Sequence, residues 1–322
     1  MRGSGDVVAK VVNGEVVKHL AFRFFVTVFV TFGDETHLCG GVIYDRAHVL
    51  TAGHCLHGGV SAKPDRIVIR AFDNTNIFDA NTKQDYGVSS YAVHPLYEDT
   101  SLHNDYAIAR VTKNFTFGAD QVVFASSRHV WEQNTQNDAL LTVGHGVTET
   151  GKASEQLRVA KLARVPTASC GYSAETLGRD FCARSFYACE DGKCQDSCQG
   201  DSGGPLFQTK LDATGKDYHD QIPDGGVIVF GLTSRGGECG SNSTPGIYSP
   251  THLALNWLRT FAETSVAGGE GDGAHQAHHA GATTNDFGRD VTENKRSWER
   301  EATIYVLLVV AGLWLFRIFS DL

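Results

Sequence analysis

The fold of this chain is limited most by short runs rich in Val, Ile, Phe and Thr, which recur from about Val11 to Phe261. Examples are RFFVTVFVTFGDE, DRIVIRAFDN and GGVIVFGLTS, and Gly, Asn and Asp separate the runs. Such runs are typical of strands in a sandwich or a barrel. We therefore expect an all-β fold, which 322 residues with 41% hydrophobic content can build as one large domain or two ordinary ones. A helical pattern, HLALNWLRTFAE, closes the region with Leu253, Trp257 and Phe261 at four-residue spacing.

Eight cysteines bear on both the cross-linking and the compartment of the chain. Three of them lie in CEDGKCQDSCQGDSGGP, a stretch that fits a metal knuckle, a disulfide loop or a catalytic loop. The six cysteines outside the 189–194 pair are spread from Cys39 to Cys239, and this spread favours disulfides in an oxidising compartment. The N-terminus MRGSGDVVAK lacks the apolar core of a signal peptide, so we expect a truncated or engineered start.

The composition changes after Glu263. Residues 264–300 are rich in Gly, Ala, His and charged residues, and we expect a flexible polar linker there. The mostly apolar residues 302–319, with Arg317 reaching the interface, are nearly long enough for a membrane-anchoring helix. The alternatives are a terminal helix packed on the globular domain and a tail that is exchanged for a lipid anchor. Basic residues before this segment favour a cytosolic domain, whereas disulfides require the opposite side, so an N-terminal signal would have to set the orientation.

Three short motifs together indicate nucleophilic catalysis. VLTAGHC contains His54, NDYAIAR contains Asp105, and GDSGGP contains Ser202 between glycines that permit a tight turn. A lone histidine or turn aspartate says little, but the order His, Asp, Ser is that of one known catalytic triad and excludes an α/β-hydrolase. Residues 11 to about 262 resemble the trypsin subgroup of the chymotrypsin-like serine proteases, over about three quarters of the chain.

The resemblance implies a fold and a mechanism. The fold is two six-stranded antiparallel β-barrels packed face to face, with the C-terminal helix after them. Ser202 would be the nucleophile, His54 its general base, and Asp105 the group that orients the imidazole. The backbone N–H groups of Gly200 and Ser202 would form the oxyanion hole, and Ser234 matches the position that supports the buried aspartate.

The resemblance also implies a substrate preference. Asp196 matches the acid at the base of the primary pocket of trypsins, where a Lys or Arg side chain is the natural partner of a buried carboxylate. Ser197 lies beside it, Gly236 and Gly246 match the glycine walls of the pocket, and Leu102 borders the neighbouring subsite. We therefore expect a serine endopeptidase that cleaves after Arg or Lys.

The segment VAKVVNGE resembles an activation junction of this family. Residues 1–10 would be the remnant of an activation peptide, and residues 11–263 the protease domain. Cleavage after Lys10 would release the amine of Val11, which would pair with Asp201 and order the pocket.

The resemblance also sorts the cysteines. Three pairs are those of the family, and the remaining two cysteines, five apart in CEDGKC, are close enough for a local loop. The expected disulfides are Cys39–Cys55, Cys170–Cys182, Cys198–Cys239 and Cys189–Cys194. Because these pairs use every cysteine, we do not expect a zinc site. A calcium loop is an alternative for RAFDNTNIFDANTKQD, but Asp73, Asp79 and Asp85 do not fall at a convincing spacing, so we expect no metal there either.

Two positions depart from the family pattern. Arg235 stands where a Trp is usual beside the substrate, and His145 stands where Trp is common. From the first we derived the hypothesis that Arg235 favours acidic residues two to four positions before the cut.

The expected partners follow from these assignments. They are protein or peptide substrates with Arg or Lys before the cut, an activating protease, protein protease inhibitors, and membrane lipid at the C-terminal tail. The net charge of −9 and the absence of a basic stripe in the sequence argue against nucleic acid. No cofactor is expected, and the expected location is the secretory pathway or the cell surface. The alternative function is a catalytically inactive protease homologue that acts as a binding module.

Overall fold

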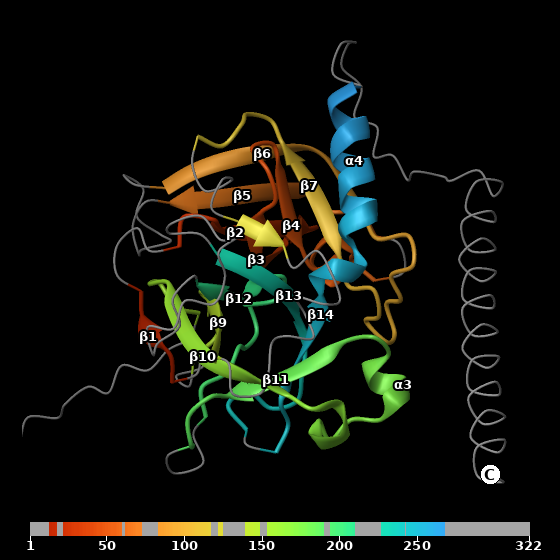
Figure 1. Ribbon diagram of the computed structural model, residues 1–322. Coiled ribbons are helices and arrows are strands. Elements are labelled where there is room, and N and C mark those ends of the chain that lie inside the picture. Colours follow the sequence, from red (N-terminus) through yellow and green to blue (C-terminus); the bar gives the residue numbers. More distant parts are fainter. Residues whose placement is uncertain are drawn as a thin grey trace, which may run out of the picture. The chain divides into compact units, whose positions relative to one another are not determined.

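The computed structural model describes residues 13–17, 22–59, 62–72, 83–116, 122–124, 139–148, 153–189, 194–209, 227–241 and 243–267. Within these residues the protein consists of strands and a few short helices, followed by the longer helix α4 (Leu255–Ala267) (Figure 1). Lys10, Val11 and the expected membrane-anchoring segment 302–319 lie outside the described residues. Among the helices that the structure describes, none is long and apolar enough to cross a membrane.

The first barrel is built from the N-terminal half of the domain. Its antiparallel strands close in the order β2-β3-β4-β7-β6-β5. The strands are β2 (Phe25–Phe32), β3 (Glu35–Ile43), β4 (His48–Thr51), β5 (Arg66–Phe72), β6 (Lys83–Val93) and β7 (Ala107–Val111). The short helix α1 (Gly53–Leu56) follows β4 directly.

The second barrel closes in the order β9-β10-β11-β14-β13-β12, again with antiparallel neighbours. Two further strands are added outside this ring: β1 pairs with β10, and β8 runs parallel to β13. The two closed six-stranded barrels confirm the expected architecture. The bounds are β1 (Glu15–Val16), β8 (Val122–Phe124), β9 (Ala139–Gly144), β10 (Arg158–Val165), β11 (Phe181–Ser185), β12 (Pro205–Thr209), β13 (Val227–Arg235) and β14 (Gly246–Pro250), with η1 (Thr167–Ser169) and α3 (Ala174–Leu177) before β11 and η2 (Thr251–Leu253) after β14.

The alternation along β2 explains how one strand serves two cores. Val26, Val28 and Val30 are fully buried and belong to the core inside the first barrel. Phe25 points to the other face and joins a second apolar cluster with Val143 and Phe207 of the second barrel. Successive side chains of a strand point to opposite faces, so the same period of two fills the barrel and binds it to its neighbour.

This second cluster places the residues of the expected active site between the two barrels. It includes Tyr106, whose hydroxyl donates a hydrogen bond of 2.8 Å to the carbonyl of Pro250 at the end of β14. Burial of each large apolar side chain contributes about 1.5–3 kcal/mol, so the seam is a strong constraint on how the barrels meet. Asp105, the residue before Tyr106, is therefore fixed where the barrels join.

Helix α4 is joined to the first barrel by hydrogen bonds of the buried His48 in β4. His48 is 1% exposed, and its Nδ1 lies 2.8 Å from a carboxylate oxygen of Asp45. Its Nε2 lies 2.8 Å from the hydroxyl of Ser265, and its ring meets Phe261 edge-on. These contacts continue the helix to Ala267, past the boundary that composition predicts after residue 263.

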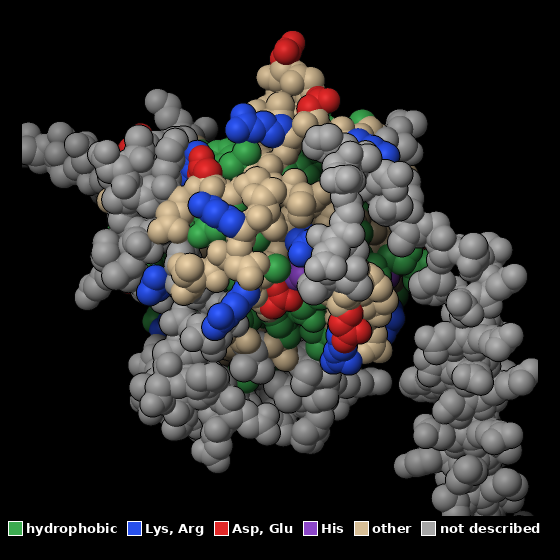
Figure 2. Space-filling view, turned by 90° about the horizontal axis from the view of Figure 1, so that it is seen from above, with side chains coloured by type: hydrophobic (Ala, Val, Ile, Leu, Met, Phe, Trp, Pro, Cys, Tyr) green, Lys and Arg blue, Asp and Glu red, His purple; other side chains and the backbone are tan. Residues whose placement is uncertain are grey.

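Charged side chains of both signs are interspersed on the face of the domain that Figure 2 shows from above. Among the described residues of that face, the charges do not gather into a patch of one sign. Such a face lacks the basic stripe with which a protein neutralises a phosphate backbone.

Candidate active site

The imidazole of His54 and the carboxylate of Asp105 form a hydrogen-bonded pair. His54 lies in helix α1, directly after β4, and Asp105 lies just before β7, the strand that pairs with β4. His54 Nδ1 donates to Asp105 Oδ2 at 2.8 Å, and the backbone N–H of His54 donates to Oδ1 at 2.8 Å. The hydroxyl of Ser234 donates to Oδ2 at 2.6 Å. Because a carboxylate cannot donate, Nδ1 carries a proton and Nε2 of the neutral ring is left as a base.

The backbone before Asp105 is unusual. Leu102 and Asn104 have φ angles of +54° and +53°, a region that residues with a side chain seldom occupy. The side-chain amide of Asn104 compensates by donating to the carbonyl of Leu96 at 2.8 Å. This turn, with its two positive φ angles, places the fully buried carboxylate of Asp105 beside the imidazole of His54.

Burial and the charge of the partner shift the pKa of each residue of this pair in opposite directions. Burial alone would raise the pKa of Asp105, but the hydrogen bonds and charge of His54 and the Ser234 hydroxyl bring the pKa below its ordinary value. Burial alone would lower the pKa of His54, but the adjacent Asp105 raises it above the ordinary value. The carboxylate therefore stays ionised while the imidazole titrates.

Ser202 lies in a tight turn that runs against the first barrel. Its neighbours Gly200 and Gly203 have φ angles of +93° and +76°, which favour glycine. A Cβ at Gly203 would stand only 2.6 Å from the backbone nitrogen of Ala52, and Gly40 N–H donates to the Ser202 carbonyl at 2.8 Å. The absence of side chains thus lets the serine loop approach the segment that leads to His54.

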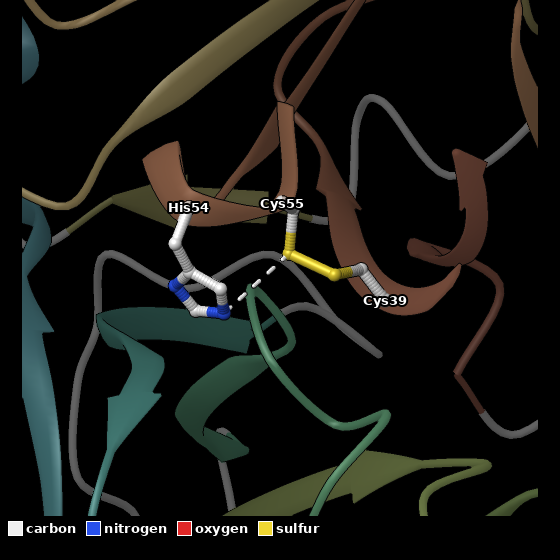
Figure 3. Close-up of side chains that lie close together, drawn as sticks. All are labelled: Cys39, His54 and Cys55. Carbon is white, nitrogen blue, oxygen red and sulfur yellow. Dashed lines mark hydrogen bonds between the residues drawn. A yellow bond between two sulfur atoms is a disulfide. The ribbon is translucent and has the colours of Figure 1, made fainter. Parts of the chain in front are cut away.

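The disulfide Cys39–Cys55 borders the base. Nε2 of His54 lies 3.9 Å from Cys55 Sγ (Figure 3), and among the described residues no hydrogen bond joins the Ser202 hydroxyl to the imidazole. Contacts between a nucleophile and its base are often long without substrate and tighten on binding. The sulfurs and imidazole are also close enough for a metal, but sulfurs in a disulfide are not thiolates and do not fit a zinc site.

Asp196 lies at the base of a buried polar site. It is 6% exposed and accepts hydrogen bonds from the backbone N–H groups of Ser197 (2.9 Å) and Gly240 (3.0 Å). A Cβ at Gly246 would lie 3.4 Å from Asp196 Oδ1, and one at Gly236 would lie 3.4 Å from Gly246 Cα. Burial raises the pKa of Asp196 to about 7, against the two backbone hydrogen bonds that lower it. A carboxyl that ionises with such difficulty is stabilised by any cation that enters beside it.

A second buried acid, Asp201, lies one residue before the serine. It accepts from the N–H groups of Gly146 (2.7 Å) and Cys198 (2.9 Å), and burial raises its pKa to about 6. Glycine is needed at Gly144 and Gly146, because a Cβ at either position would overlap the Asp201 carboxylate. Like Asp196, this carboxyl would be stabilised by a cation.

The segment just after the expected activation junction is docked on the second barrel. The Asn13 side-chain amide donates to the Cys194 carbonyl at 2.9 Å, and the Gln195 amide donates to the Asn13 carbonyl at 3.2 Å. Arg158 donates to the carbonyl of Gly14 at 3.1 Å. The chain is thus held two residues beyond Val11, which itself lies outside the described residues.

Comparison with known proteins agrees with this geometry. The family model described as Trypsin matches residues 11–258. The chain belongs to the trypsin family. Among curated members of the family, the chain is 29% identical to Trypsin iota over 69% of the chain and 77% of that protein, and 31% identical to Serine protease snk over 70% of the chain and 49% of that protein. It is also 26% identical to Serine protease grass over 77% of the chain and 67% of that protein, and all three are from Drosophila melanogaster. The chain therefore spans about half of the length of snk.

Four disulfides brace this trypsin-family domain, and they confirm the expected pairings. Cys39–Cys55 lies beside the base, and Cys198–Cys239 joins the serine loop to the segment that carries Gly240. Cys170–Cys182 ties the region of α3 to β11. Cys189–Cys194 ends at the residue whose carbonyl accepts the hydrogen bond from Asn13.

The two residues that depart from the family pattern both make hydrogen bonds inside the protein. His145 is 1% exposed, and its Nδ1 lies 2.9 Å from the carbonyl oxygen of Ser154. The guanidinium of Arg235 pairs with Asp180 at 2.6 Å, so this geometry argues against our hypothesis that Arg235 selects acidic substrate residues. Sequence reasoning missed Asp180, and the one signal for it was an unexplained cation next to Ser234.

Proposed function

We propose that this trypsin-family protein is a serine endopeptidase that cleaves peptide bonds after Arg or Lys. The observation that carries the proposal is the hydrogen-bonded His54–Asp105 pair, whose neighbour Cys55 contacts the carbonyl of Ser202. The buried acid Asp196 lies six residues before Ser202. The His54–Asp105 pair supplies a general base. The buried Asp196 carboxyl would be stabilised by a cationic substrate side chain.

The geometry supports the following mechanism. Ser202 Oγ attacks the carbonyl of the bond to be cut, and Nε2 of His54 takes the hydroxyl proton and later returns it to the leaving amine. Asp105 keeps the imidazole in the required tautomer and stabilises its protonated form. The backbone N–H groups of Gly200 and Ser202 stabilise the oxyanion, a contribution of about 2.7–4 kcal/mol for each donor. The φ angle of +93° at Gly200 supports this role, because it turns the backbone of the loop sharply before the serine.

Substrate selection follows from the charge of Asp196. An Arg or Lys side chain that enters past the adjacent Gly236 and Gly246 meets the buried Asp196 carboxyl. The resulting ion pair stabilises an ionised carboxylate that burial alone disfavours. Ser197 extends the polar floor, since its hydroxyl lies 2.8 Å from that of Tyr248. Leu102 borders the next subsite.

Activation is part of the same proposal. Cleavage after Lys10 frees the Val11 amine, which supplies Asp201 with the cation that a buried carboxyl needs. The docking of Asn13 supports this step, because it holds the chain close to the serine loop before the new amine inserts. The four disulfides support a secretory location, and the apolar residues 302–319 support attachment to a membrane.

A binding role without catalysis is the second candidate function. It requires that the Ser202 hydroxyl stays unactivated when substrate is present. The two functions make opposite predictions for an acylating or phosphonylating probe, which reacts only with an activated serine.

One experiment decides between them. The full chain and its Ser202→Ala variant are cleaved at Lys10, cleavage is verified by mass spectrometry, and fluorogenic peptide amides with Arg, Lys, Phe or Glu before the amide are assayed together with a fluorophosphonate label. The endopeptidase hydrolyses the Arg and Lys amides and is labelled, whereas the variant does neither. A verified, folded product that neither cleaves nor labels would make the protein a binding module.

A further inference from the structure

The guanidinium of Arg235 is held by four acceptors from separate parts of the chain. Nη1 donates to Asp180 Oδ2 at 2.6 Å and to the carbonyl of Leu102 at 3.1 Å. Nη2 donates to the carbonyl of Thr176 in α3 at 2.6 Å. Nη1 also donates to the hydroxyl oxygen of Ser234 at 3.3 Å. One side chain of β13 therefore joins the loop before β7, helix α3 and the residue before β11.

Two of these acceptors lead directly to the His54–Asp105 pair. The Ser234 oxygen that accepts from Arg235 belongs to the hydroxyl that donates to Asp105 at 2.6 Å. Leu102 lies three residues before Asp105 and has the strained φ of +54°. By bonding the carbonyl of Leu102, Arg235 holds in place the backbone that delivers the carboxylate.

The positive charge of Arg235 is paired with the carboxylate of Asp180 inside the protein. The side chains of Arg235 and Asp180 are 13% and 4% exposed. Burial raises the pKa of Asp180, while the adjacent Arg235 opposes the rise, so the carboxylate depends on its partner. Removal of either partner would leave a buried charge unpaired, and a neutral side chain at Arg235 would release three backbone or side-chain acceptors as well.

We propose that Arg235 is a positioning residue of the proposed peptidase: held by its ion pair with Asp180, it fixes the Asp105 carboxylate against the imidazole of His54 through Leu102 and Ser234. The inference rests on the proposed function, because its readout is catalysis at the same site. It assigns to Arg235 an internal role where an apolar surface for the substrate is the family's usual arrangement.

A second effect of the same residue is electrostatic. The groups that act on the His54 imidazole are Asp105 and Asp99, which raise its pKa, and Arg235, which lowers it. Loss of the Arg235 charge therefore raises the pKa of His54. Since the base must be neutral to accept a proton, the acid limb of the pH profile of kcat/KM then moves to higher pH.

The test compares three variants of the full chain after verified cleavage at Lys10. Arg235→Met removes both the charge and the donors, and Arg235→Lys keeps the charge but lacks the fork that reaches several acceptors. Arg259→Met removes an exposed charge from α4 and is the matched control. Each variant is checked for folding by thermal unfolding, and kcat and KM for an Arg peptide amide are measured from pH 5 to pH 9.

The expected result separates positioning from stability. Arg235→Met lowers kcat/KM by up to about 100-fold, mainly in kcat, and moves the acid limb upward. Arg235→Lys also lowers kcat but leaves the acid limb where it is in the wild type, so this variant still tests the idea if Arg235→Met does not fold. Unchanged kcat in both Arg235 variants, with an active wild type, would overturn the inference. An inactive wild type that also fails to label would instead overturn the proposed function.

Discussion

Replacement of Asp196 by Asn tests the idea that a buried acid waits in this protein for a cationic partner. The pKa of Asp196 is about 7 in the folded protein, compared with an ordinary value of 3.8. The folded state thus holds a proton between about pH 4 and pH 7 that the unfolded state has released. Stability must therefore fall as pH rises through this window, by roughly 4 kcal/mol at ~1.4 kcal/mol for each pKa unit.

Asparagine removes this titration and keeps the shape of the side chain. Its amide group cannot accept from both Ser197 and Gly240, so the variant should be less stable than the wild type at pH 4 by about 1–3 kcal/mol. At pH 8 the variant should be at least as stable as the wild type, because only the wild type then carries a buried negative charge at this position. The nearby Asp201 titrates in both proteins, so only its charge coupling to Asp196 remains in the difference.

The assay is denaturant unfolding of the wild type, Asp196→Asn and the surface control Asp34→Asn at pH 4 and pH 8. The difference between wild type and Asp196→Asn should change by roughly 4 kcal/mol between the two pH values, and that of the control should not change. With the activated enzymes, kcat/KM for Arg and Lys amides should fall on the order of 10²- to 10⁴-fold in Asp196→Asn, as expected for about 3–5 kcal/mol from one partner of a buried pair. A stability difference that is the same at both pH values, or undiminished cleavage after Arg, would refute the reasoning.

Two further substitutions test the packing around the site and the attachment of α4. Gly144→Ala should destabilise the fold by about 1–3 kcal/mol and reduce amidase activity, because the added Cβ overlaps the Asp201 carboxylate. The control Gly87→Ala, whose Cβ would meet only Thr112 at 3.4 Å, should do neither. Equal unfolding midpoints for the two variants would contradict the overlap. Ser265→Ala should lower the free energy of unfolding by about 1 kcal/mol by removing the hydroxyl that meets His48, and an unchanged value in urea unfolding would show that the contact does not hold α4.

Local patterns in the sequence were sufficient for the fold class and for the residues around the serine. The period of two in FVTVFVTF places Val26, Val28 and Val30 on one face, and glycines around Ser202 are required by positive φ angles that few other residues tolerate. The pairing of cysteines and the roles of His54, Asp105 and Ser202 needed a resemblance in addition, because no local rule joins residues that are far apart in sequence.

The features that could be predicted directly are those that depend on neighbours along the chain: strand periodicity, tight turns and the motifs that carry reactive side chains. The contact of Arg235 with Asp180, 55 residues away, and that of His48 with Ser265, 217 residues away, follow only from the three-dimensional packing. In both cases a polar group is largely removed from solvent, and its partner is supplied by the way the two closed barrels and their helices pack. The physical reason is that burial requires a hydrogen-bonding partner for a charge, but leaves the choice of partner to the topology.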